Sequence, residues 1–123
     1  HLSGIPTLFT SIESDQESFD ICLALSLIDK DENIINQFST GFLRVKGFKH
    51  DQKKIYRIEF QPINICVSKG NKLRLSISAS AWPAIGINPG FDNKQYGQVT
   101  MNHQIITLNF DLSKTIMKIN PFF

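Results

Sequence analysis

The chain has 123 residues, of which 41% are hydrophobic, and a formal net charge of +2 at pH 7. This length fits one domain with its own core, and the apolar content is too high for a disordered chain. The small net charge argues against a nucleic-acid partner, and no apolar run approaches the ~20 residues of a membrane-spanning helix. We therefore expect a soluble domain with no nucleic-acid and no membrane partner.

Alternating apolar and polar residues predict antiparallel strands from the start of the chain. The first two are expected at Ile5–Glu13 and Phe19–Ile28. In the second strand the odd-numbered residues form an unbroken apolar row. The opposite row carries small side chains: Asp20, Cys22, Ala24 and Ser26. Such a row suits close packing against another surface, and a further layer of sheet would satisfy it equally well.

Further short strands are expected around residues 34–38, 41–45, 55–60, 63–68, 73–80, 96–101 and 105–112. The tail after Leu112 fits either one more strand or a helical turn. Short strands joined by polar turns, with no amphipathic helix, indicate an all-β, two-layer antiparallel β-sandwich or a barrel. The strand at Leu73–Ser80 alternates most regularly and stops before Trp82-Pro83, and we expect it to mark the centre of the sandwich.

The two cysteines, Cys22 and Cys66, lie in predicted strands and lack the C-x-x-C spacing of zinc and thioredoxin-type sites. We expect both to be buried, reduced thiols, which favours a cytoplasmic protein. A cross-strand disulfide between them is the alternative, and it would favour a structural sandwich of a secreted or surface protein.

No catalytic arrangement is evident in the sequence. The G-x-S-x-G elbow of α/β-hydrolases is absent, and the histidines are at the terminus (His1) or in predicted turns (His50 and His103). The acidic turn that begins at Asp29 lacks the glycine and the glutamate of a calcium-binding loop. No glycine pattern for nucleotide binding occurs. We therefore expect no catalytic, metal-binding or cofactor-binding residues in this chain, and no cofactor.

Four short motifs follow one another in an order typical of one family. They are L-x-G-I-P at Leu2–Pro6, L-I-D-K-D at Leu27–Asp31, G-F-L-R at Gly41–Arg44, and the serine-rich strand and loop of Gly70–Gly90. From Leu2 to about Phe110 the chain resembles the C-terminal non-catalytic domain of X-prolyl dipeptidyl-peptidases. The same domain occurs in their relatives, the serine hydrolases of the cocaine esterase and glutaryl-7-ACA acylase type. Family members commonly have a basic residue where this chain has Ala84.

This resemblance implies a jelly roll of the galactose-binding-domain-like type. The chain, residues 1–123, would then be a single domain and the C-terminal fragment of a larger α/β-hydrolase, which agrees with the absence of an initiator methionine at His1. The parent would cleave an ester or amide bond with a Ser-His-Asp triad outside this chain. This domain alone would be inert. It would pack on the catalytic domain, help to shape its substrate entrance, and could support homo-oligomers.

Five residues are candidates for interdomain or substrate-entrance contacts: Trp82, Pro83, Asn88, Pro89 and Gly90. Tryptophan is favoured at desolvated contact centres, and the resemblance implies that the loop after the serine-rich strand faces the catalytic domain. A loop aromatic folded over the edge of the core is the structural alternative for Trp82. The alternative function is a carbohydrate-binding module, with Trp82, Phe91 and Tyr96 as its sugar-stacking surface.

Overall fold

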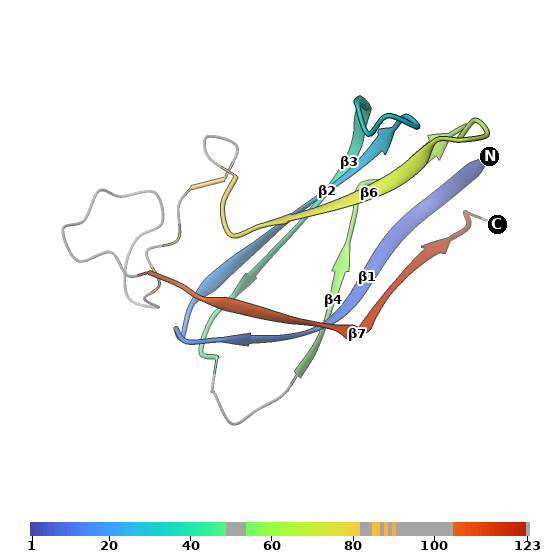
Figure 1. Cartoon of the computed structure of the whole chain (residues 1–123). Coiled ribbons are helices and arrows are strands. Elements are labelled where there is room, and N and C mark those ends of the chain that lie inside the picture. Colours follow the sequence, from blue (N-terminus) through green and yellow to red (C-terminus); the bar gives the residue numbers. More distant parts are fainter. Residues whose placement is uncertain (49–53, 82–84, 87, 89, 91–104, 123) are drawn as a thin grey trace.

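The computed structural model describes residues 1–48, 54–81, 85–86, 88, 90 and 105–122. This part of the chain contains seven strands and no helix, and the strands form two antiparallel sheets packed face to face (Figure 1). The predicted all-β, two-layer antiparallel sandwich is therefore confirmed. No helix in these ranges is long and apolar enough to cross a membrane.

The larger sheet is built around β1 (Leu2–Ser14), which pairs with three other strands. β4 (Lys54–Glu59) and β7 (Leu108–Asn120) lie on its two edges, and β5 (Ile63–Ile65) pairs with its first residues. Pro62 separates β4 from β5, as expected for a residue that cannot donate to the ladder. The tail of the chain is a continuation of β7, so the strand alternative for it is correct.

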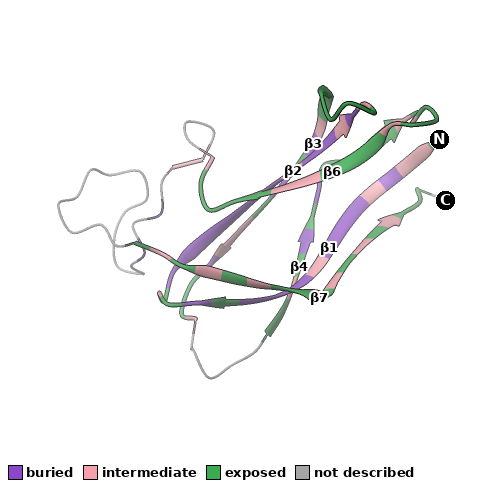
Figure 2. Cartoon of the chain, in the orientation of Figure 1, coloured by how far each residue is buried: buried purple, intermediate pink, exposed green. Residues whose placement is uncertain are grey.

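The smaller sheet has the order β3-β2-β6. β2 (Phe19–Ile28) is its central strand, between β3 (Ile34–Val45) and β6 (Lys72–Ser78). The expectation that the serine-rich strand marks the centre of the sandwich is therefore wrong, because β6 is an edge strand. Regular alternation reflects a strand with one face in water, whereas β2 is largely buried on both faces (Figure 2).

The hydrophobic core lies between β1 and β2. The aliphatic and aromatic side chains that are at most 3% exposed come from β1, β2 and β4: Leu8, Ile12, Phe19, Ile21, Leu23, Leu25 and Ile58. The ring of Phe19 packs edge-on against Phe48 and Tyr56, with centroid distances of 5.6 and 6.4 Å. Each such side chain contributes roughly 1.5–3 kcal/mol on burial, so these two rows determine which faces of the sheets meet.

One side of the sandwich is closed where β3 meets the end of β4. Gly41 forms an isolated bridge with Phe60, and the Gln61 amide donates to the Thr40 carbonyl at 3.0 Å. A Cβ atom at position 41 would lie 3.0 Å from the carbonyl oxygen of Glu59. The glycine of the G-F-L-R motif therefore allows the two sheets to join at this crossing.

Neither cysteine forms a disulfide. The prediction of free thiols is confirmed for both, and Cys22 is buried as expected. Cys66 is exposed, which corrects the prediction that it is buried. β5 ends at Ile65, so the next residue no longer lies between the sheets, and its Sγ atom is 3.2 Å from Nδ1 of His1.

Candidate functional site

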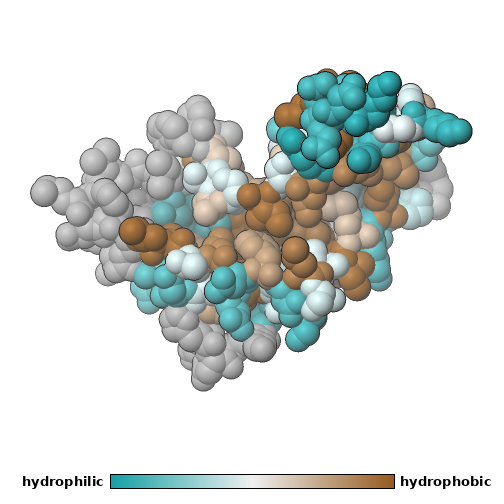
Figure 3. Space-filling model, in the orientation of Figure 1, coloured by the Kyte–Doolittle hydropathy of each residue, from teal (hydrophilic) through white to brown (hydrophobic). Residues whose placement is uncertain are grey.

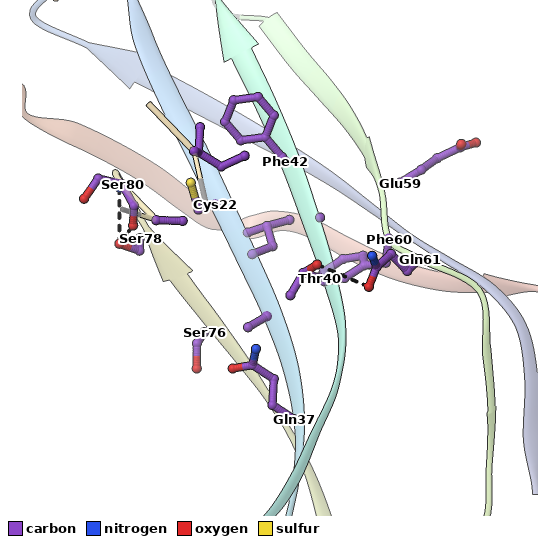
Figure 4. A pocket seen from close by; sticks show the side chains of 15 residues that line it. Cys22, Gln37, Thr40, Phe42, Glu59, Phe60, Gln61, Ser76, Ser78 and Ser80 are labelled. Carbon is purple, nitrogen blue, oxygen red and sulfur yellow. Dashed lines mark hydrogen bonds between the residues drawn. The ribbon is translucent and has the colours of Figure 1, made fainter. Parts of the chain in front are cut away.

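The outer face of the β3-β2-β6 sheet carries mostly small side chains, as predicted for β2. Residues that face one another in neighbouring strands point to the same side of a sheet. Pairing places six residues in two rows across this floor: Phe42, Cys22 and Ser78, followed by Thr40, Ala24 and Ser76. We call these six residues the floor (Figure 4).

A recess of about 630 Å³ opens over the floor. On one side it is lined by Phe60 and Gln61, at the crossing of β3 and β4. Ser80, Ala81 and Ile85, from the segment that follows β6, also line it. Its volume lies within the range of ligand pockets, roughly 300–1,000 Å³.

The recess offers hydroxyl, amide and thiol groups rather than a catalytic pair. Ser78 Oγ donates to the Ser80 carbonyl at 2.8 Å. Burial, together with the nearby Asp20 carboxylate, raises the pKa of the Cys22 thiol. A thiol with a raised pKa stays protonated near neutral pH and is a poor nucleophile. The described lining contains no histidine beside a hydroxyl or a thiol, so this arrangement suits contact rather than bond cleavage.

A buried ion pair lies on the same outer face, two residues along each strand from the pair of Cys22 and Phe42. Arg44 on β3 donates from Nε and Nη2 to the two carboxylate oxygens of Asp20 on β2, at 2.8 and 2.7 Å. The Asp20 side chain is 2% exposed and the Arg44 side chain 22%. A bidentate pair of this kind compensates the cost of removing a carboxylate from water.

The ion pair also holds the segment that follows β6. Arg44 Nη2 donates to the Gly86 carbonyl at 2.9 Å, and Asn88 Nδ2 donates to Oδ1 of Asp20 at 3.0 Å. Asn88 Oδ1 accepts from the Gly90 amide at 2.9 Å. We call Asp20, Arg44 and Asn88 the clasp. It fastens Gly86, Asn88 and Gly90 to the outer face of the sheet.

Two of the five predicted contact residues, Asn88 and Gly90, lie in the described structure, and both are buried. Asn88 is 8% exposed, and its side chain hydrogen-bonds to Asp20 on β2 and to the Gly90 amide. The other three, Trp82, Pro83 and Pro89, lie outside the described residues, as do Phe91, Tyr96, His50 and His103. The contact roles of all five residues, and the sugar-stacking roles of Trp82, Phe91 and Tyr96, stay predictions.

The acidic turn between β2 and β3 is a hydrogen-bonded surface turn, as predicted. Oδ1 of Asp29 accepts from the amides of Asp31 and Asn33, each at 2.9 Å. These bonds, that of Asn33 first, lower the pKa of the Asp29 carboxyl. No group of three or more His, Cys, Asp or Glu side chains able to hold a metal ion occurs among the residues that the structure describes.

Sequence reasoning missed the clasp and the recess. It placed Asp20 in a row of small, weakly polar residues, whereas Asp20 is a buried charge with a dedicated partner. The available signal was an acidic residue inside an apolar strand and an arginine in a neighbouring predicted strand, since buried charges need partners. The recess had no comparable signal, because it depends on where β4 crosses β3 and on the path after β6.

The family of X-Pro dipeptidyl-peptidase C-terminal non-catalytic domains matches residues 1–112 of the chain. No curated protein and no solved structure gives a significant match. The family match spans the Leu27–Asp31 motif, which forms the turn at Asp29, and the Gly41–Arg44 motif, which supplies the crossing at Gly41 and the ion pair of Arg44. The chain therefore belongs to the family of X-Pro dipeptidyl-peptidase C-terminal non-catalytic domains.

Proposed function

We propose that this domain packs through the floor and recess of its β3-β2-β6 sheet against the α/β-hydrolase catalytic domain of the same polypeptide. Membership of the family implies association with a catalytic domain in the same chain. In this proposal that domain carries the Ser-His-Asp triad, and the parent is an X-Pro dipeptidyl-peptidase or an esterase or acylase. The observation that carries the proposal is the small-residue floor with its open recess.

The side chains of the floor suit a protein partner. Ala24, Ser76 and Ser78 are small, so side chains of a partner can approach the backbone of the sheet. Phe42, at 39% exposed, supplies apolar contact area at the side of the recess, and Phe60, at 4% exposed, forms part of its wall. An apolar centre with hydroxyl and amide groups around it is the usual composition of a specific protein interface.

We further propose that the segment after β6 helps to shape the substrate entrance. Ala81 and Ile85 line the recess, and the clasp holds Gly86 and Asn88 on the same face of the sheet. A catalytic domain seated on the floor would therefore also meet this segment. This shared face supports the predicted contact role of the loop that contains Trp82, Pro83 and Pro89.

The test uses the full-length polypeptide with a protease cleavage site inserted before His1. After cleavage, we expect the two fragments of the wild type to co-elute in gel filtration. Ala24→Arg places a long cation on the floor and should separate them. Ser68→Arg makes a comparable small-to-arginine change at an exposed position outside the recess, and its fragments should remain together. Separation of the wild-type fragments, or co-elution of the Ala24→Arg fragments, would overturn the proposal.

A further inference from the structure

Within the described residues, the sandwich is closed along one of its two sides and open along the other. Residues between 7 and 12 of β1 pair with both β4 and β7, so these strands lie on opposite edges of β1, and β3 and β6 likewise flank β2. Because β3 meets the end of β4 at Gly41 and Phe60, β6 and β7 lie on the other side. Figure 1 shows the sandwich viewed from the side of β6 and β7. No described segment pairs with the free edge of β6 or of β7.

Inward-facing apolar side chains of both edge strands line this opening. Leu73, Leu75 and Ile77 of β6 pair with core-facing leucines of β2, yet Leu73 is 40% and Ile77 36% exposed. Met117 and Ile119 of β7 pair with buried residues of β1 and are themselves only half-buried. We call these five residues the seam. Figure 3 shows apolar surface between the two strands.

A single extended strand would complete the structure on this side. A two-sheet core normally buries the inward rows of its edge strands, and a free edge leaves alternate amides and carbonyls without a partner strand. Strand addition would pair the free edge of β6 and cover the apolar rows of both sheets at once. Pairing two copies of β6, which has 7 residues, would leave the β7 row uncovered.

We propose that an extended segment of the catalytic-domain portion of the same polypeptide adds as a strand to the free edge of β6 and covers the seam. This inference rests on the proposed function for the identity of the partner. Lys72 and Arg74 are exposed on the outward row of β6. The added strand should therefore carry apolar residues at alternate positions facing the seam and acidic residues opposite these two cations.

The start of the chain lies close to the seam. Leu2 pairs with Ile65 at the end of β5, shortly before β6 begins, and Ile5 pairs with Asn120 at the end of β7. A catalytic portion that precedes this domain joins it through His1. A segment leading into β1 therefore reaches the opening from the end where β6 begins and β7 ends, without crossing either sheet.

Amide hydrogen exchange of β6 in this chain alone and in the full-length polypeptide tests the inference. The amides of Lys72–Ser78 should exchange at least ~10-fold more slowly in the full-length protein, because an added strand protects edge amides. Leu73→Lys should abolish that protection. Ile55→Lys is the matched control, since Ile55 is 61% exposed and lies outside the seam. In the isolated chain both variants should keep the wild-type Tm within about 3 °C, because both side chains already face water.

Several outcomes of this experiment would overturn the proposed addition of a strand to β6. Equal exchange of β6 in the two proteins would overturn it, as would loss of protection in both variants or in neither. If β6 is unprotected but the cleaved fragments still co-elute through Ala24, the packing proposal stands and only the strand addition fails. If Leu73→Lys folds poorly in the full-length protein, Ile77→Lys, at a position 36% exposed, makes the same test.

Discussion

Among single residues, the buried ion pair of Asp20 and Arg44 should be the most sensitive point of the outer face. Arg44→Ala leaves a carboxylate that is 2% exposed without its bidentate partner, and we expect a loss of about 3 kcal/mol in the free energy of unfolding. Urea denaturation followed by fluorescence measures it.

The matched control is the exposed ion pair of Arg57 and Glu59, whose side chains are 55% and 51% exposed. Arg57→Ala should cost no more than about 0.5 kcal/mol, since water screens such pairs. Asp20→Ala combined with Arg44→Ala should cost less than the sum of the two single changes, because the double variant leaves no buried charge. Equal losses for Arg44→Ala and Arg57→Ala would contradict the role of the clasp.

The Asp29 turn should make a pH-dependent contribution to stability. Its carboxyl pKa is lowered from 3.8 in the folded chain by the turn amides. The ionised group therefore stabilises the fold above its unfolded pKa, and this contribution is lost as the pH falls through the folded pKa. The Tm difference between the wild type and Asp29→Asn should be largest near neutral pH and should shrink as the pH falls below 3.8 and through the folded pKa.

Asp31→Asn removes the same charge two residues away, and the described structure shows no turn bond to that carboxylate. It should lower the Tm at neutral pH by less than Asp29→Asn does. A difference between wild type and Asp29→Asn that persists undiminished in acid would show that the charge of Asp29 is not what holds the turn.

Among the strands, the attachment of β7 to β1 depends on Gly4. Its φ is +144°, and a Cβ atom there would collide with the backbone at Asn120 and Pro121. Gly70 has a φ of +90°, and a Cβ atom there would meet nothing within 4 Å. Gly70→Ala should therefore cost only the backbone contribution of about 1–2 kcal/mol, and Gly4→Ala should cost more and speed amide exchange at the end of β7. Equal costs would argue against the close approach.

The sequence predicted which residues of a strand face the core, but it did not predict the order of the strands. Side-chain alternation predicted the apolar row of β2 correctly, because the period of two decides which residues can face a second sheet. The predicted break between two strands at Pro62 was also correct. Alternation did not distinguish the central β2 from the edge strand β6, since strand order depends on pairings between distant segments.

The candidate site was predictable only in part. The small outer row of β2 was visible in the sequence, and two of its residues, Cys22 and Ala24, lie in the floor of the recess. The recess itself requires Phe60 and Gln61 to cross β3, and Asn88 to reach Asp20, which lies 68 residues away in the chain. No local pattern specifies such contacts, so the clasp could not have been located before the fold was known.

For the whole molecule, the described structure offers two kinds of contact surface. One surface is the floor with its recess, and the other is the apolar seam along β6 and β7. The buried thiol of Cys22 has a raised pKa, and the Sγ atom of the exposed Cys66 lies beside the imidazole of His1 at the start of the chain. The chain belongs to a family of non-catalytic domains, and these are the two surfaces through which we propose that it associates.

The most direct test is an assay of the isolated chain with Gly-Pro-p-nitroanilide and with p-nitrophenyl acetate. A domain that acts only through its surfaces should release p-nitroaniline and p-nitrophenol no faster than buffer does, while the full-length polypeptide turns over one of these substrates. Turnover by the isolated chain that a serine-directed phosphonate abolishes would contradict this account.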